Sequence, residues 1–474
     1  MSFTSPPFFV FFGLYFLAGL LLPRRGWLWL AAVASSFFYG WWDWRFLFLL
    51  YYVVTVSWFV GRGLARSEDQ AVRRRYVLLS VISCLAVLAT FKYFGFFVDS
   101  FINVSAALGL KLAPRVTQIL LPVGISFYTF HALSYTIDLY RRKLKAPADY
   151  LSLVVYLAFF PQLVAGPIVR ASRFLPQIQR GPVFSPRKIK TGLLIIAWGY
   201  FLKVCVADSI ALVVDPIFAA PADFESGNLL FAIICYSFQI YTDFAGYSMI
   251  AIGLAKLQGF DFPANFLAPY FSRSFREFWR RWHISLSSFL RDYLYIPLGG
   301  NRHGPWREDR NILTTMLLGG LWHGASYNFV VWGALHGLYL IIERHARALL
   351  PRLSSRSLRT LKWPLAAGRI GLVYVMVLLT WVFFRLHNFS DALSLLAGIA
   401  RHQHPGVISN KFEACKVAAL IVATLAVDGI FINRRSCVRL LRTRYAYACS
   451  LALLGVLIEL FGSFGGGAFI YFQF

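Results

Sequence analysis

The chain alternates long apolar runs with short basic loops. Residues 8–22 and 119–140 are apolar, and they end at the turns that begin with Pro23-Arg24-Arg25 and with Arg141. Runs of this length cross the hydrocarbon core of a bilayer as helices. Continued to the end, the pattern predicts about eleven membrane-spanning helices. We therefore expect an all-α polytopic membrane protein, with residues 1–474 forming a single integral-membrane domain.

Two stretches fit neither a span nor a loop. Residues 160–168 place Pro161, Gly166 and Pro167 within membrane reach, where a broken helix is tolerated only if protein or a water-filled cavity covers the freed backbone groups. Residues 269–301 interleave arginines with aromatic residues, and at helical spacing they present one apolar face. We expect the first stretch to be re-entrant or cavity-lining and the second to be an amphipathic helix in the cytoplasmic interface.

Composition agrees with a membrane protein and excludes other classes. Hydrophobic residues make up 58% of the chain, which is more apolar surface than a soluble core of this size hides. The net charge of +26 is spread over short loops, as expected for cytoplasmic loops that face anionic lipid headgroups, so we expect no nucleic-acid partner. The six cysteines show no paired spacing, and we expect neither a disulfide framework nor a cysteine-bound metal.

The candidate chemistry lies in residues 311–343, an apolar stretch long enough to cross a bilayer that contains His323 and His336. A titratable ring at hydrocarbon depth indicates a functional site by default. Glycines 319, 320 and 324 surround His323, and they let backbone or substrate approach closely and let the helix bend. The alternative is a packed histidine that fills space beside Trp322.

The two histidines are unsuited to a shared metal site. They are 13 residues apart, which on an unbroken helix of roughly 100° per residue leaves their directions about 220° apart. Unless Gly324 or Gly333 breaks the helix, only one of them is expected to be central, and His336 is then a supporting or packed residue. A second pair, His402 and His404, lies in a loop without carboxylate or cysteine ligands nearby, so we expect no metal.

Other polar residues and missing motifs limit the reactions that the chain is expected to catalyse. Asp243 and Tyr247 interrupt the apolar residues 229–257, and Asp243 is either a structural carboxylate paired with an arginine or a group that lines a reaction cavity. The sequence contains no phosphate loop, no nucleophile elbow and no dinucleotide-binding pattern. An imidazole suits removal of a hydroxyl proton as a general base, and the basic interfacial face suits a phosphate-bearing donor such as coenzyme A.

Several long motifs resemble the membrane-bound O-acyltransferase family, and within it the bacterial alginate O-acetyltransferase branch. The motifs are FREFWRRWHISLS at 275–287, RDYLYIPLGGN at 291–301, GLWHGAS at 320–326, FPQ at 160–162 with AGPI at 165–168, DFAGYS at 243–248 and FIYFQF at 469–474. The resemblance covers most of the chain. It departs from the family pattern at Met249, where the family usually has a second acidic residue.

The resemblance implies a ring of tilted helices, with re-entrant and interfacial helices around a central catalytic cavity. It implies a catalytic His323, a second functionally important His283 and a catalytic core at residues 271–342. We expect the side chains that hold the donor to be Arg280, Arg281 and Trp282. We expect the side chains around the reaction cavity to be Asp243, Tyr247, Trp322, Asn328 and His336.

The resemblance also implies an activity and a location. We expect an O-acetyltransferase of the bacterial inner membrane that passes acetyl groups from a cytoplasmic donor, acetyl-CoA, to an exported polysaccharide such as alginate. A periplasmic acetyltransferase would be its partner, and no cofactor would be bound permanently. Two alternatives stay open: acyl transfer to another acceptor, such as teichoic acid, lipid or protein, and a transporter or flippase in which histidine and Asp243 relay protons.

Overall fold

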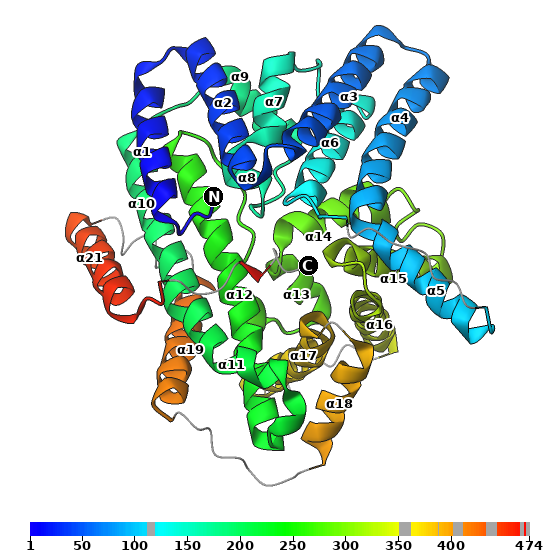
Figure 1. The fold of residues 1–474 in the computed structure, drawn as a ribbon, viewed down its shortest axis with the longest axis vertical. Coiled ribbons are helices and arrows are strands. Elements are labelled where there is room, and N and C mark those ends of the chain that lie inside the picture. The colour runs from blue at the N-terminus through cyan, green and yellow to red at the C-terminus, as the bar shows by residue number, and fades with distance from the viewer. Residues whose placement is uncertain are drawn as a thin grey trace. The chain divides into compact units, whose positions relative to one another are not determined.

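The computed structural model describes residues 1–110, 119–349, 362–386, 388–401, 411–432, 443–464 and 469–470 (Figure 1). All regular structure in these ranges is helical, which confirms the prediction of an all-α protein. Contacts group the chain into two compact units, residues 1–196 with 250–263 and residues 197–249 with 264–474. The His402 and His404 pair lies outside the described residues.

The first unit is built from the N-terminal helices. They are α1 (Pro6–Leu21), α2 (Arg24–Asp43), α3 (Phe46–Arg66), α4 (Gln70–Leu88), the π-helical turn η1 (Ala89–Tyr93), α5 (Phe94–Ala107), α6 (Ile125–Tyr140), α7 (Tyr150–Ala158), α8 (Phe160–Leu163), α9 (Ala171–Arg180) and most of α10 (Pro186–Tyr200). Helix α6 packs against both α3 and α4 and is buried along nearly its whole length, while α7 packs against α2, α3 and α9 (Figure 1).

Residues 160–168 form the broken stretch that the sequence predicts. Helix α7 ends at Ala158, the single turn of α8 follows, and residues 160–169 are all buried in protein. Gly166 allows the chain to turn back on itself, because a Cβ there would lie 2.6 Å from the Pro161 carbonyl oxygen. Protein therefore covers the backbone groups that this interruption leaves outside a helix.

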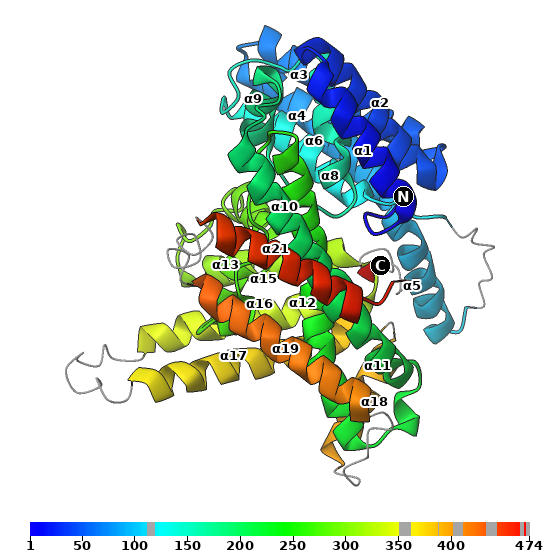
Figure 2. The same ribbon diagram turned by 90° about the vertical axis from the view of Figure 1, so that its left-hand side faces the viewer.

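The second unit carries the rest of the chain. Its elements are η2 (Phe201–Ala207, π-helical), α11 (Asp208–Ala219), η3 (Pro221–Asp223), most of α12 (Ser226–Leu257), η4 (Pro269–Phe271), α13 (Phe275–Arg281), α14 (Ile284–Leu290), η5 (Arg291–Tyr295, π-helical), α15 (Pro305–His323), α16 (Tyr327–Leu349), α17 (Lys362–Arg385), α18 (Phe389–Ala400), α19 (Lys411–Ile432) and α21 (Arg444–Phe461). Helices α19 and α21 both pack on η2, and α16 packs along α17 (Figure 2).

Five helical stretches of the described chain are long and apolar enough to cross a membrane. They are Phe46–Arg66, Gln70–Ala107, Ser226–Leu257, Trp363–Arg385 and Arg444–Phe461. The chain is thus a multi-pass membrane protein by helix length and composition. The larger number of spans expected from the sequence stays a prediction, as does the single integral-membrane domain.

Residues 311–343 do not form one continuous helix, and the sequence interpretation as a single apolar span is wrong. Helix α15 ends at His323, Gly324 is extended at φ −163° and ψ 153°, and α16 begins at Tyr327. The two helices are antiparallel neighbours: Gly320 near the end of α15 lies against Phe329 near the start of α16, and Gly337 further along α16 lies against Leu313 further back in α15. The approach is so close that a Cβ on Gly320 would overlap the Phe329 carbonyl and a Cβ on Gly337 would meet Leu313. The glycines of this stretch therefore bring two helices close together, and His323 lies at the turn of a helical hairpin.

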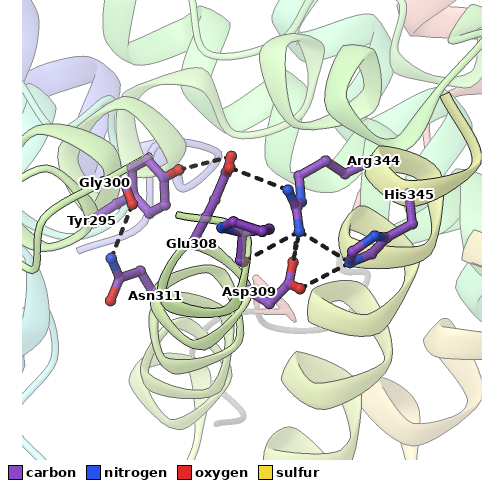
Figure 3. A network of polar contacts seen from close by, with 8 residues as sticks. Tyr295, Gly300, Glu308, Asp309, Asn311, Arg344 and His345 are labelled. Atoms are coloured by element: carbon purple, nitrogen blue, oxygen red, sulfur yellow. Dashed lines mark hydrogen bonds and ion pairs between the residues drawn. The ribbon is translucent and has the colours of Figure 1, made fainter. Parts of the chain in front are cut away.

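A polar network ties the far ends of the same hairpin together (Figure 3). The Arg344 guanidinium on α16 donates to Asp309 Oδ1 at 2.6 Å and to Glu308 Oε2 at 3.3 Å, both on α15. The His345 ring lies 2.9 Å from Asp309 Oδ2, and the Tyr295 hydroxyl lies 3.4 Å from Glu308 Oε1. The hairpin is thus fixed by close glycine contacts near His323 and by charged hydrogen bonds at its open end.

Candidate functional site

His283 occupies a sharp turn between α13 and α14. Its backbone is left-handed, at φ 41° and ψ 55°, which is uncommon for a residue with a Cβ. The side chain is completely buried, and neither ring nitrogen has a hydrogen-bond partner among the described residues. Burial lowers the pKa of His283 to about 3, so the ring is neutral at physiological pH. A strained backbone and an unsatisfied buried ring together indicate a functional position.

Asn265 holds the turn that carries His283. Its backbone oxygen accepts from Ile284 N at 2.8 Å, and its Oδ1 accepts from the Ser285 backbone at 3.2 Å and from the Ser285 hydroxyl at 2.8 Å. Its Nδ2 donates to the Ser248 hydroxyl on α12 at 3.0 Å. One buried asparagine therefore accepts from the first donors of α14 through its backbone and side-chain oxygens, and its side chain anchors them to α12.

His323, at the end of α15, lies beside His283. The centroids of the two rings are 6.3 Å apart, and His323 is 4% exposed. Aromatic rings pack on His323 from two other helices, with Trp332 of α16 at 5.0 Å and Phe384 of α17 at 5.2 Å. Trp322 packs edge-on to His323 at 5.0 Å and lies 5.9 Å from His283. The structure thus places three of the residues predicted for the site in ring contact.

His336 contacts Trp332, the same ring that packs on His323. Its ring packs on Trp332 at 4.7 Å and is parallel to Phe278 at 5.9 Å. Its Nε2 lies 3.1 Å from the hydroxyl of Thr380, which donates its own proton to the Val377 carbonyl at 2.6 Å. Nε2 is therefore the protonated nitrogen, and it donates to Thr380. The ring is fixed in one tautomer and supports Trp332, which in turn contacts His323.

The three residues expected to hold the donor have different surroundings. Arg280 is exposed and has no hydrogen-bond or ion-pair partner among the described residues. Arg281 donates to Glu277 at 2.7 Å and to the Leu267 carbonyl at 3.4 Å. Trp282 is 1% exposed and packs against Trp381 at 4.8 Å. Arg280 is therefore exposed and unpaired in the described part of the chain, whereas Arg281 and Trp282 contact neighbouring residues.

The carboxylate expected at the cavity is buried in an ion pair. Asp243 Oδ1 lies 2.8 Å from Lys203 Nζ, so its partner is a lysine rather than the arginine that the sequence suggested. The same Nζ lies 2.7 Å from Asp208 Oδ1. Tyr247, one turn after Asp243 on α12, stacks on Phe469 with ring centroids 4.5 Å apart.

Asn328, in the first turn of α16, is buried and donates from Nδ2 to the Leu386 carbonyl at the end of α17. Its Oδ1 has no hydrogen-bond partner in the described part of the chain. The residue therefore links the hairpin turn to α17, and it leaves one buried acceptor at that turn.

Sequence reasoning missed Asn265 and Lys203. Lys203 interrupts the apolar residues 191–207, which is the same signal that singled out His323, so it could have been found. Asn265 lies in a loop, and nothing in its local sequence distinguishes it. Groups of three or more histidine, cysteine, aspartate or glutamate side chains placed to hold a metal do not occur among the described residues.

Comparison with known proteins identifies the family. Residues 125–385 match the membrane-bound O-acyltransferase family. The chain is 41% identical over 386 residues to a probable alginate O-acetylase of Pseudomonas aeruginosa, covering 81% of this chain and 71% of the relative. This chain belongs to the membrane-bound O-acyltransferase family. The resemblance stated from the motifs is confirmed.

Two further relatives of this acyltransferase widen the comparison. A probable alginate O-acetylase of Pseudomonas putida is 38% identical over 428 residues, covering 89% of this chain and 84% of the relative. A peptidoglycan O-acetyltransferase of Helicobacter pylori is 34% identical over 405 residues, covering 80% of this chain and 74% of the relative. The part that matches the acyltransferase family includes both α13–α14 and the α15–α16 hairpin, and thus His283 and His323.

Proposed function

We propose that this acyltransferase moves acetyl groups from acetyl-CoA, on the cytoplasmic side of the bacterial inner membrane, to hydroxyl groups of an exported polysaccharide such as alginate. The observation that carries the proposal is the buried contact between His323 and His283 in a chain of the O-acyltransferase family. The names of its relatives, two alginate O-acetylases and a peptidoglycan O-acetyltransferase, support a polysaccharide acceptor.

In the proposed reaction His323 is the general base. An unprotonated ring nitrogen takes the proton of the acceptor hydroxyl while that oxygen attacks the thioester carbonyl carbon. The carbon–sulfur bond then breaks, the thiolate leaves, and the proton passes from the ring to the sulfur. The products are an acetyl ester and free coenzyme A, and the histidine returns to its starting state.

His283 and Arg280 would bind the substrates in this reaction. Because the His283 ring is neutral and buried, it can donate one hydrogen bond and accept another beside His323 without adding charge to the site. Arg280 is exposed on the basic face and would contact the phosphates of the donor. Asp243 would orient a neighbouring group, and Tyr247, Trp322, Asn328 and His336 would shape the cavity.

Three finer features belong to the same proposal. About eleven spans would form a ring around the catalytic cavity. Where a periplasmic acetyltransferase relays the acetyl group, the hydroxyl that attacks the thioester would belong to that protein, which would then pass the acetyl group to the polymer. Membrane lipid would surround the apolar helices that the structure leaves exposed, such as α1 and α21.

The assignment of His323 is tested with labelled acetyl-CoA and purified protein in detergent. We expect His323→Ala to lower acetyl transfer by roughly two orders of magnitude or more, because a positioned base contributes a factor of that size. The matched control is His303→Ala, which removes an exposed histidine. If His323→Ala transferred acetyl at the wild-type rate, the assignment would be wrong.

The acceptor is tested by mass spectrometry of cell-surface polymers from a deletion strain. Loss of acetyl groups from the exported polysaccharide supports the proposal. Loss from teichoic acid, lipid or protein, with the polysaccharide unchanged, would assign a different acceptor. Movement of a substrate across the membrane without covalent transfer would indicate a transporter.

A further inference from the structure

Lys203 brings two carboxylates together in the second unit. Its Nζ lies 2.7 Å from Asp208 Oδ1 and 2.8 Å from Asp243 Oδ1, and all three side chains are at most 8% exposed. Lys203 lies on the π-helical turn η2, a distortion that is frequent at functional sites. One carboxylate is enough to neutralise one lysine, so the second adds a buried negative charge. The electrostatic balance of the cluster does not explain why Asp243 is there.

Asp243 makes one contact that Asp208 does not. Its Oδ2 accepts a hydrogen bond from the Ile470 backbone N–H at 2.8 Å, while Oδ1 faces Lys203. Phe469 and Ile470 are each 4% exposed. The ion pair with Lys203 therefore fixes a carboxylate that in turn fixes a buried stretch of backbone more than two hundred residues away in sequence.

The fixed backbone lies next to the candidate site. The Phe469 ring stacks on Tyr247 at 4.5 Å and lies 5.9 Å from Phe244. The Phe244 ring in turn packs edge-on to His283 at 4.7 Å. A continuous series of contacts thus runs from Asp243 through Phe469 and Phe244 to the His283 ring.

We propose that Asp243 is a positioning residue, which holds the backbone at Ile470 so that Phe469 keeps Phe244 and the His283 ring in the geometry for acyl transfer. Its catalytic consequence rests on the proposed function. Lys203 fixes Asp243 for this task, and Asp208 balances Lys203 without contacting Ile470. The two carboxylates share one lysine and differ in this contact, so each provides a control for the other.

The test compares Asp243→Asn with Asp208→Asn in the full-length protein. Hydrogen exchange at the Ile470 amide reports the contact directly and needs no activity. We expect Asp243→Asn to speed that exchange about tenfold or more, because the single amide oxygen of asparagine turns toward the Lys203 ammonium and the Ile470 N–H loses its charged acceptor. Asp208→Asn is expected to leave the exchange unchanged. For acetyl transfer, we expect Asp243→Asn to lower kcat about tenfold to a hundredfold with little change in KM for acetyl-CoA.

A double-mutant comparison separates positioning from general destabilisation. Ile470→Pro removes the N–H that Asp243 accepts and leaves the ion pair with Lys203 in place. Asp243→Asn and Ile470→Pro both break the same hydrogen bond between Ile470 N–H and Asp243. The kcat of the double variant should therefore be no lower than that of the more impaired single variant. Asp208→Asn and Ile470→Pro change different contacts, so the factors by which each single change alters kcat should instead multiply in the double variant.

The outcomes are distinct. If Asp243→Asn left exchange at Ile470 unchanged, or if Asp208→Asn lowered kcat equally, Asp243 would have no positioning role. If the wild-type protein transferred no acetyl groups, but hydrogen exchange at the Ile470 amide still became faster in Asp243→Asn, the proposed function would be wrong and the contact between Asp243 and Ile470 would be confirmed.

Discussion

The close approach of α15 and α16 provides a sharp test of how the hairpin sets the position of His323. A Cβ added at Gly320 would overlap the Phe329 carbonyl oxygen and lie 3.2 Å from Gly333 Cα. Both neighbours are backbone atoms, so neither can move aside as the end of a side chain could. We expect Gly320→Ala to force the two helices apart.

The size of the effect follows from the contact distances. For the new Cβ of residue 320 to lie at an ordinary contact distance of 3.4 Å from the Phe329 oxygen, the backbones of α15 and α16 must separate by about 1 Å. A displacement of His323 on that scale costs on the order of a hundredfold in rate. Overpacking of this kind also costs about 1–3 kcal/mol of stability. The greater helix propensity of alanine returns about 1 kcal/mol of this.

Gly319→Ala is the matched control. It makes the same substitution one residue earlier in α15, but within the described ranges the new Cβ would meet only the Leu290 Cδ1 methyl, at 3.1 Å. The assay is acetyl transfer from labelled acetyl-CoA, with thermal unfolding followed in the same detergent. Gly320→Ala should lose about two orders of magnitude in kcat and unfold at a lower temperature, whereas Gly319→Ala should retain both. Equal activity and stability of the two variants would show that the hairpin contact does not set the His323 position.

Three other predictions follow from single residues. Asn265→Ala should lower the free energy of unfolding by about 1–3 kcal/mol, because the Ser285 backbone N–H and hydroxyl lose the acceptor that Asn265 provides. It should also lower kcat by loosening the His283 turn; denaturant unfolding and acetyl transfer measure the two effects. Arg281→Ala should lower the unfolding temperature, whereas Arg280→Ala should raise KM for acetyl-CoA and leave that temperature unchanged; the reverse pattern would exchange their roles. Partial burial raises the pKa of Asp309, but hydrogen bonds from its neighbours outweigh this and hold it below its ordinary value. The ionised Asp309 therefore stabilises the folded protein fully above the ordinary carboxyl pKa of 3.8, and this stabilisation is lost as the pH falls through the lowered pKa. The unfolding free energies of wild type and Asp309→Asn should approach each other over that pH range. A difference between them that stayed constant as the pH fell below 3.8 would contradict this.

The sequence pattern predicted the all-helical class, and it singled out His323 as a candidate, because both depend on local information. Apolar runs identify helices, and an imidazole in an apolar run stands out whatever surrounds it. The family motifs implied a role for both His323 and His283, and the structure places the centroids of these two rings 6.3 Å apart.

The pattern of apolar and polar residues could not predict contacts between residues that are far apart in the sequence. An unbroken helix from residue 311 to 343 has the same apolar spacing as two helices joined at Gly324, and contacts between the two helices, such as that of Gly320 with Phe329, distinguish them. The same holds for Asn265, whose importance comes from partners 17 and 20 residues away, and for the lysine that replaced the expected arginine beside Asp243. Partner identity depends on the fold, and periodicity carries no information about it.

The left-handed backbone at His283 has a consequence for protein engineering. A residue with a Cβ in this conformation costs about 1 kcal/mol or more, and glycine or asparagine would relieve part of that cost. Glycine would leave a cavity where the buried ring packs on Phe244, so a screen for thermostable variants that did not also select for acetyl transfer would favour asparagine over glycine as the replacement of this histidine. Directed evolution of this enzyme should accordingly recover its most heat-resistant sequences among its least active ones, unless both properties are selected together.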